Sequence, residues 1–438
     1  MSRPRLRGGS TAVIPLASRG MEDPQPGAWE TPSPRPRAGV LGVLGLLGLG
    51  GLAVVAAAAV LLAGGDGGEP ELPVEETTEP PEAVALGSVE PLPAGPLSAR
   101  SDAVHAWTGE ELIVWGGLEL EPVSDDRAVR RVTELLGDDG AAFSPATGEW
   151  RELPPAPIEP RLHPATAWAG DRLFVWGGAG EGFRPVDDGA VYLPDQDRWE
   201  TLPPAPLDGR MPWTGVWSGE EFLVVGASVT GGGADEPAEL VGGAAFDPSS
   251  GTWRSLPPPP VRFESFPAAT WLGERLVVWR GSRGAVYDPD RDRWETAELP
   301  EPARAPGPTF VAALDDTRLA ILGVRPVGDR NASGAVYDLA ADAVEPIAPG
   351  APTWLGNVRF VAAGDYVLLL PDGFTHDRRP RPGGLAWDGR ARWWPLPDLV
   401  GDRSGYTSAW TGEELLIWGG FDGSSAHDDG VRWRPTAP

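Results

Sequence analysis

The 438-residue chain contains no cysteine and no lysine, and it has only four histidines. The absence of cysteine excludes disulfide bonds, thiolate metal sites, cysteine nucleophiles and a lipid-modified N-terminal cysteine. The four histidines form no pair with the spacing of metal ligands, so the sequence predicts no metal site. We also predict no cofactor and no catalytic residue. All 36 basic residues are arginine against 63 acidic residues, and the net charge of −27 argues against a nucleic-acid partner.

Glycine and proline are abundant, with 59 and 50 residues, a composition that borders on that of disordered chains. The chain nevertheless has 20 tryptophans. Disordered chains avoid aromatic residues because they cannot bury them. We therefore expect glycine and proline to separate many short strands in a folded domain.

Residues 38–65 carry no charge, and as a helix they would span about 42 Å, enough to cross a bilayer. Arginines precede this segment and acidic residues follow it, which places the N-terminus in the cytoplasm by the positive-inside rule. We predict a disordered cytoplasmic tail (1–37), a single transmembrane helix (38–65) in the lipid bilayer, an acidic proline-rich stalk (66–85) and an extracytoplasmic domain (86–438). A cleaved signal peptide is the alternative, although a leader of about 37 residues is long for one.

One pattern occurs seven times in residues 86–438, most clearly as AWTGEELIVWGG (106–117), AWAGDRLFVWGG (167–178) and AWTGEELLIWGG (409–420). A second pattern follows the first six copies, as in GAVYLPDQDRW (189–199), with an aromatic residue and a tryptophan seven positions apart. Each unit of about 50 residues predicts four short strands. Seven such units predict an all-β, seven-bladed β-propeller.

The paired glycines, the tyrosine or phenylalanine before an Asp-Pro turn, and the tryptophan followed by Leu-Pro-Pro-x-Pro resemble kelch repeats. The resemblance covers residues 86–438 and is weakest in copies five and six, where the glycine pair and the tryptophan are partly lost. It implies a kelch-type propeller, here as a membrane-anchored protein of bacterial type.

The last unit ends at GVRWRPTAP and lacks an outer strand, whereas residues 89–100 align without a gap to the outer-strand segment 150–161. We therefore predict that a strand near Ala85–Leu92 completes the last blade beside Val431–Arg434.

The tryptophans that recur in one register are interpreted as packing between blades, whereas Trp213, Trp354 and Trp393 fall outside it and are candidates for exposed contacts.

Loops between the second and third strands vary in length, so one face of the ring is elaborated and is the expected functional face. The longest insertion, residues 118–139, contains a segment (124–137) that predicts a helix stopping at Gly137 and exposing Arg127, Arg130 and Arg131, as a lid or as rim packing.

An arginine series recurs about seven residues before the first-strand tryptophan or its equivalent: Arg100, Arg161, Arg210, Arg304 and Arg403, with Glu264 interrupting it. These side chains are candidates for binding an acidic ligand near the centre of the ring. The alternative is that they pair with acidic neighbours to hold the blades. Asp pairs such as Asp138–Asp139 precede the third strand, where we expect backbone capping rather than Ca²⁺ binding.

We interpret the protein as a binding module for a protein or an anionic cell-surface polymer, met through the loop-rich face, and not as an enzyme. Kelch-like copper radical oxidases depend on a cysteine crosslinked to tyrosine, so the absence of cysteine excludes that activity. The alternative function is a glycan-active enzyme, sialidase-like or sugar-epimerase-like, that would use Tyr406, Glu264 and the arginine series. A third interpretation is a structural stalk tip without a ligand.

Overall fold

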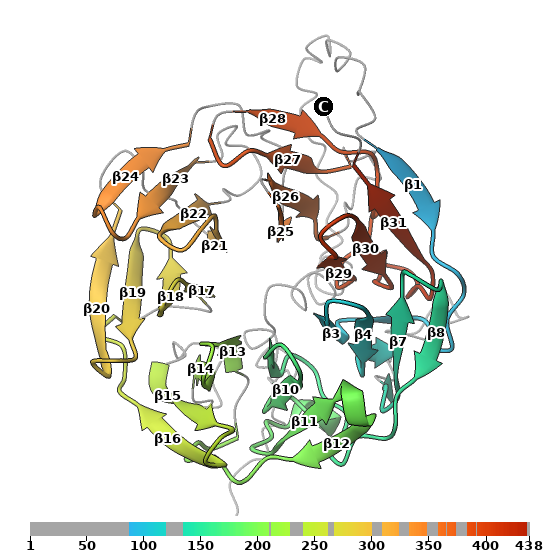
Figure 1. Ribbon diagram of the computed structural model, residues 1–438, viewed down its shortest axis with the longest axis horizontal. Helices are drawn as coiled ribbons and strands as arrows, with labels where there is room; N and C mark the ends of the chain where they lie inside the picture. Colours follow the sequence, from blue (N-terminus) through green and yellow to red (C-terminus); the bar gives the residue numbers. More distant parts are fainter. Residues whose placement is uncertain are drawn as a thin grey trace, which may run out of the picture. The chain divides into compact units, whose positions relative to one another are not determined.

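The computed structural model describes residues 87–119, 135–209, 212–227, 240–261, 267–299, 309–323, 333–347, 358–364, 366–373, 383–390 and 392–435. They belong to the second of the two compact units of the chain, residues 41–438. These residues form a ring of seven four-stranded antiparallel sheets, the blades (Figure 1). The prediction of an all-β, seven-bladed propeller is confirmed.

The predicted tail, membrane segment and stalk, residues 1–85, lie outside the described residues. Within the described ranges, no helix has the length and hydrophobicity needed to span a membrane.

In each blade the innermost strand is followed by three strands placed successively further out (Figure 1). Blades 1 to 3 consist of β3 (Val104–Trp107), β4 (Leu112–Trp115), β7 (Gly140–Ser144) and β8 (Glu149–Glu152); β9 (Ala165–Trp168), β10 (Leu173–Trp176), β11 (Gly189–Leu193) and β12 (Arg198–Thr201); and β13 (Pro212–Trp217), β14 (Phe222–Ala227), β15 (Leu240–Asp247) and β16 (Thr252–Leu256). Blades 4 and 5 consist of β17 (Ala268–Leu272), β18 (Arg275–Arg280), β19 (Arg283–Asp288) and β20 (Arg293–Glu298); and β21 (Thr309–Ala313), β22 (Arg318–Gly323), β23 (Ser333–Asp338) and β24 (Ala343–Pro346).

Blades 6 and 7 consist of β25 (Val358–Ala363), β26 (Tyr366–Pro371), β27 (Leu385–Trp387) and β28 (Trp393–Pro395); and β29 (Thr407–Trp410), β30 (Leu415–Trp418), β31 (Gly430–Arg434) and β1 (Ser88–Pro91). A small sheet joins β2 (Arg100–Ser101), β5 (Leu118–Glu119) and β6 (Leu135–Leu136). Two short 3₁₀ helices, η1 (Glu181–Phe183) and η2 (Pro194–Gln196), complete the described elements.

The hydrophobic core formed by the described residues is divided into seven clusters, and each cluster joins two neighbouring blades. Trp279 of blade 4, for example, lies against Tyr337 of blade 5, with ring centroids 5.8 Å apart. A single blade therefore cannot bury both of its faces alone, which is why the repeats must close into a ring.

The recurrent tryptophans pack between blades as predicted. Trp115, Trp176, Trp279 and Trp418 of the second strands are at most 1% exposed. The outer-strand tryptophans Trp150, Trp199, Trp253 and Trp294 each donate the indole N–H to a proline carbonyl after the outer strand of the preceding blade, at 2.8–3.1 Å. The Leu-Pro-Pro motif therefore has a physical role, because its proline carbonyl accepts a hydrogen bond from the tryptophan indole of the next blade.

Two predictions fail in detail. Trp393 was placed outside the repeat register, but it pairs with Trp387 across β27 and β28 and its ring stacks on that residue at 5.3 Å. The turn of blade 6 is one residue shorter than in other blades, so the register tryptophan comes six residues after the aromatic. The helix predicted to stop at Gly137 is also wrong at its end, because Leu135 and Leu136 form β6 and pair with β5.

The N-terminal strand closes the ring as predicted. β1 pairs antiparallel with β31 at the outer edge of blade 7, with Val89 opposite Trp433 and Pro91 opposite Val431 (Figure 1). Just beyond the strand, the Leu92 N–H donates to the Gly430 carbonyl at 2.9 Å. Both ends of the propeller sequence thus share one blade.

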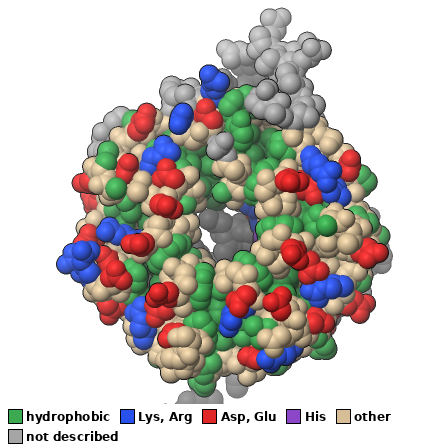
Figure 2. All heavy atoms as spheres, in the orientation of Figure 1, with side chains coloured by type: hydrophobic (Ala, Val, Ile, Leu, Met, Phe, Trp, Pro, Cys, Tyr) green, Lys and Arg blue, Asp and Glu red, His purple; other side chains and the backbone are tan. Residues whose placement is uncertain are grey.

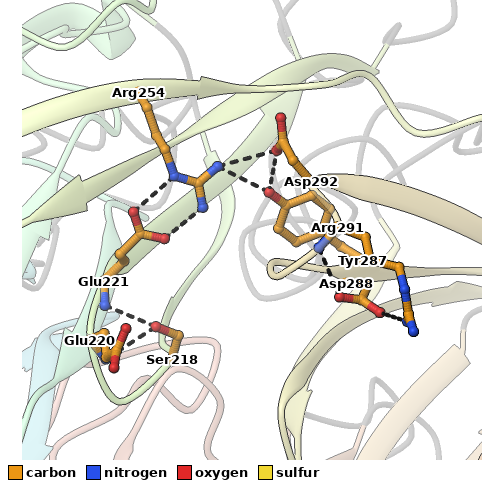
Figure 3. Close-up of polar contacts among 8 residues, drawn as sticks. All are labelled: Ser218, Glu220, Glu221, Arg254, Tyr287, Asp288, Arg291 and Asp292. Carbon is orange, nitrogen blue, oxygen red and sulfur yellow. Dashed lines mark hydrogen bonds and ion pairs between the residues drawn. The ribbon is translucent and has the colours of Figure 1, made fainter.

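Polar side chains join neighbouring blades in a repeated arrangement, the inter-blade clamp. In Figure 3, Arg254 of blade 3 contacts Glu221 of its own blade, at 2.6 and 2.8 Å, and the Tyr287 hydroxyl of blade 4 at 3.0 Å. That hydroxyl donates to Asp292 at 2.6 Å. Blades 1 and 2 repeat the arrangement with the residues Arg151, Glu111, Tyr192 and Asp197.

The tyrosines of the two clamps, together with Tyr337 of blade 5, predict a loss of stability in alkali. Burial raises the pKa of Tyr192, Tyr287 and Tyr337 to about 12, against about 10 in an unfolded chain. Below pH 10 both states are protonated and stability is complete. Above pH 10 only the unfolded state releases its protons, so stability falls as the pH rises toward 12.

Urea unfolding at a series of pH values measures this effect. We expect each Tyr→Phe substitution to flatten the fall between pH 10 and 12 by up to about 1.4 kcal/mol per pH unit. Between pH 7 and 9 the profiles should run parallel. A Tyr287→Phe profile as steep as that of the parent protein would contradict this account.

Candidate functional site

Three arginines of the predicted series form the same contact in successive blades 7, 1 and 2. The guanidinium donates to the carbonyl of the first glycine of the pair and contacts the second aspartate of the Asp pair. These Arg–Asp latches are Arg403 with Gly419 and Asp429, Arg100 with Gly116 and Asp139, and Arg161 with Gly177 and Asp188.

The arginine side chains of the latches are mostly buried, whereas their aspartate partners are more than half exposed. Arg100 and Arg161 are 1% and 0% exposed, and the side chain of Arg403 is 21% exposed. Nη1 of Arg100 lies 2.6 Å from Asp139, and Nη2 lies 2.9 Å from Glu119. These contacts match the interpretation in which the arginines pair with acidic neighbours, and they act within a blade. They also give the Asp pairs a partner.

The glycine pair is required by the close approach of the chain at the latch. Gly117 has φ +99°, and a Cβ atom there would lie 2.8 Å from the Ser101 carbonyl oxygen. Any other residue would push β2 and its arginine away from the turn.

Most of the other predicted site residues lie outside the described part of the chain: Arg127, Arg130, Arg131, Arg210, Arg304, Trp354 and Glu264. Trp213 belongs to β13, but its side chain is not described. On the face seen in Figure 2, basic and acidic side chains are interspersed around the ring and form no continuous basic patch among the described residues.

A polar cluster of which the sequence had named only Tyr406 lies on and next to the inner strands of blades 6, 7 and 1. Arg359 of β25 contacts Asp372, which follows β26, with Nη2 3.1 Å from Oδ2. The guanidinium carbon of Arg359 lies 4.9 Å from the centroid of the Tyr406 ring, just before β29. We call Arg359, Asp372, Tyr406, His105 and Asp102 the central cluster.

Backbone contacts hold the central cluster in place. Asp372 accepts the Gly405 N–H at 2.9 Å, and the Tyr406 hydroxyl donates to the Pro371 carbonyl at 2.6 Å. Asp102 of blade 1 donates its backbone N–H to the Gly405 carbonyl at 2.7 Å. The cluster therefore links blades 6, 7 and 1 on the inner side of the ring.

The electrostatics of the central cluster fix its protonation at neutral pH. Burial, reinforced by the Arg359 charge, lowers the pKa of His105 to about 4, so His105 is neutral. Burial opposes the charge of Arg359, but Asp372, Tyr406 and Asp102 together outweigh it, and the pKa of Arg359 is raised. Burial, with Asp372 nearby, raises the pKa of Tyr406 well above its usual value, which keeps the phenol protonated.

A cavity of about 310 Å³ lies beside the central cluster, which we call the central cavity. Its walls come from β13, β17, β21 and β25, the innermost strands of blades 3 to 6 (Figure 1). Arg359, Asp372 and Thr214 supply its polar lining, while Phe310 and Phe360 contribute aromatic rings 5.8 Å apart. Nε of Arg359 is buried and has no hydrogen-bond acceptor among the described residues.

The sequence signal for this site was that copy six departs from the repeat. Arg359 of blade 6 pairs with Leu370, and the corresponding pair in blade 1 is Val104 with Trp115. Arginine thus replaces valine at this position of the repeat. Pro371 and Asp372 take the positions of the glycine pair. Weakening of the repeat in this blade coincides with a charged pair at the centre of the ring.

Fold and site together define the class: a seven-bladed β-propeller with a partly buried charged pair beside a central cavity. No protein-family model matches the chain, and no curated protein matches it. Among solved structures, the chain is similar to a fungal alcohol oxidase of the AA5 family in complex with copper, with 16% sequence identity and a TM-score of 0.59. The match covers 80% of this chain and 76% of the oxidase.

This comparison corrects the expectation that the protein is not an enzyme. The solved propeller with the similar fold is an oxidase, so the fold gives no support to a non-enzymatic assignment. At 16% identity the likeness extends to the fold and assigns no reaction.

The residues of the central cluster do not fit a copper centre. In the part of the chain that the structure describes, no three His, Cys, Asp or Glu side chains gather as a metal site requires. His105 lies in the field of the Arg359 cation, and the Tyr406 hydroxyl is engaged with a carbonyl. We therefore derive no copper-dependent step for this chain.

Proposed function

We propose that this protein is a kelch-type propeller that binds a group of its partner in the central cavity, beside the Arg359–Asp372 ion pair. The observation that carries the proposal is an arginine–aspartate ion pair, with side chains 25% and 16% exposed, in the wall of a 310 Å³ cavity. Cavities of about 300–1,000 Å³ with a few convergent polar groups are typical ligand sites. The partner is a protein or a cell-surface polymer.

The proposal includes the membrane anchor. Residues 38–65 span the bilayer, the tail 1–37 is cytoplasmic, and the stalk 66–85 holds the propeller outside the cytoplasm. The uncharged segment between a basic tail and an acidic stalk supports this topology. Fractionation of the full-length chain with the membranes of its source organism tests this part of the proposal.

The binding proposal is tested with the tagged full-length chain and an envelope extract of the source organism. We expect Arg359→Met to lower partner retention at least tenfold, because it removes the cation and leaves Asp372 unpaired. Arg403→Met is the matched control, since Arg403 is also paired with an aspartate and its side chain is similarly exposed, 21% against 25%. Equal retention by the Arg359→Met variant and the parent would overturn the proposal.

The second candidate is a glycan-active enzyme on the same propeller. The Asp372 carboxylate in the cavity wall favours it, because glycoside chemistry uses carboxylates. Tyr406 does not support a nucleophile role: it is 1% exposed, its hydroxyl donates to the Pro371 carbonyl, and its raised pKa disfavours the phenolate. Among the described residues that line the cavity, Asp372 is the single carboxylate.

A further inference from the structure

We infer that the latch of blade 2 binds a carboxylate group of a partner at the free end of the Arg161 guanidinium. This site is separate from the central cavity, so the inference goes beyond the proposed function. It is carried by a buried donor without an acceptor, by the internal carboxylate that meets the same donor in blade 1, and by a glycine that leaves the corresponding place in blade 2 without a side chain.

The guanidinium groups of Arg100 and Arg161 have the same orientation in blades 1 and 2. Nε of each donates to the backbone carbonyl two residues earlier, at 3.0 Å in blade 1 and 2.9 Å in blade 2. Nη1 of each donates to the carbonyl of the first glycine of the pair, at 3.1 and 3.3 Å. Because the guanidinium is planar, these contacts also fix the direction of Nη2, which faces the same place in both blades.

Nη2 has acceptors in blade 1 and lacks one in blade 2. In blade 1 it donates to the Ser98 hydroxyl at 2.7 Å and to the Glu119 carboxylate at 2.9 Å. In blade 2 Arg161 is 0% exposed, and its Nη2 has no acceptor among the described residues. A buried donor is costly to leave without an acceptor, so this place favours a ligand that supplies one.

The position that supplies the carboxylate in blade 1 is a glycine in blade 2. Glu119 lies opposite Arg100 in the pairing of β2 with β5. In blade 2, Leu162 pairs with Ala179, which puts residue 180 opposite Arg161 in the same way. Gly180 has φ −81°, which any residue adopts, so the backbone does not require glycine here.

The place beside Nη2 is close to solvent and is covered by one surface side chain. The Glu119 side chain that fills it in blade 1 is 28% exposed, so a carboxylate there contacts water. In blade 2 a Cβ atom on Gly180 would lie 3.0 Å from the carboxylate carbon of Glu159. Glu159 is 35% exposed and pairs at 2.8 Å with Arg184, which is 63% exposed. Such a surface pair is weak, so a partner carboxylate can displace Glu159.

The charges at this latch favour one added carboxylate. Arg161 pairs with Asp188 at 2.8 Å. When the Glu159 carboxylate turns away, Arg184 loses its partner and the group gains one positive charge. A partner carboxylate restores the balance, and Nη2 of Arg161 together with Arg184 offers donors to both of its oxygens.

The experiment titrates the full-length chain at low ionic strength by ligand-detected NMR. The two probes differ in charge: N-acetylglutamic acid α-amide and the uncharged N-acetylglutamine amide. We expect the glutamate probe to bind with a dissociation constant in the millimolar range, and at least tenfold more tightly than the glutamine probe. Glu159→Gln removes the competing charge and should tighten binding of the glutamate probe at least threefold. Equal binding of the two probes, or no binding to either the parent or the Glu159→Gln variant, would overturn the inference.

Gly180→Glu supplies the missing carboxylate from the chain itself and should abolish binding of the glutamate probe. Gln196→Glu is the matched control, because it adds the same charge at an exposed residue of η2 in the same blade. This control should bind the probe within twofold of the parent. Thermal unfolding checks that both variants are folded, and the Glu159→Gln comparison decides the matter if Gly180→Glu is not. Binding by a folded Gly180→Glu variant at the parent's affinity, or an equal loss in both variants, would contradict the assignment.

Discussion

Deletion of residues 87–91 should lower the free energy of unfolding of the propeller by about 3–5 kcal/mol, the net worth of a short strand's backbone hydrogen bonds and the packing that they hold. These residues include β1, which supplies the fourth strand of blade 7 and connects the two ends of the ring. Without β1, the β31 backbone loses its partner and Trp433, 3% exposed in the intact protein, loses its cover. Thermal unfolding and urea unfolding of the deletion variant measure the loss.

The register of β1 offers a matched pair of proline substitutions. The Leu92 N–H donates to the Gly430 carbonyl, so in the alternating antiparallel ladder Glu90 also bonds to β31 while Val89 and Pro91 point their nitrogens outward. Glu90→Pro should destabilise by about 1–3 kcal/mol, whereas Val89→Pro should change stability by less than about 0.5 kcal/mol. Equal effects would show that β1 does not pair as described.

The second large effect is expected at the buried latch of blade 1. Arg100→Met should destabilise by about 3 kcal/mol, because removing one partner of a buried ion pair leaves the other groups unsatisfied. Arg100 makes hydrogen bonds to Ser98, Gly116, Glu119 and Asp139, and its side chain is fully buried. The partner carboxylates are 28% and 53% exposed, which places the value at the lower end of the range for buried pairs.

Other arginines of the same chain serve as controls for this substitution. Arg403→Met should cost less than Arg100→Met, since Arg403 is 21% exposed. Arg172→Met should cost at most about 1 kcal/mol, because Arg172 pairs with its neighbour Asp171 on the surface. Urea unfolding of the three variants gives the order. An Arg100→Met variant as stable as the parent protein would show that the latch does not hold the blade.

The repeat made the architecture readable from the sequence. Trp115, Trp176 and Trp418 recur in one register because each occupies the same position between two blades. The last unit lacks an outer strand, and the segment before the first unit has the sequence of one. The pairing of Val89 with Trp433 could therefore be predicted. Such predictions succeed because a structural period constrains every copy in the same way.

The role of the arginine series was left open by the sequence, because spacing along the chain does not reveal a partner. Arg100 and Asp139 are 39 positions apart, and only the return of β7 beside β4 brings them within 2.6 Å. The sequence named both the arginines and the Asp pairs, but it kept them as separate candidates.

The absence of cysteine limits the chemistry of this protein, because no thiolate or disulfide contributes to the fold or to a site. The sequence alone determined the number of blades, the closing strand and the packing role of the tryptophans, because these follow from a local pattern repeated at one period. Only the tertiary structure decided where the charges meet. Arg359, Asp372 and Tyr406 lie in units where the repeat is weak or at its edge, and they become neighbours because the ring brings the innermost strands of blades 6 and 7 together.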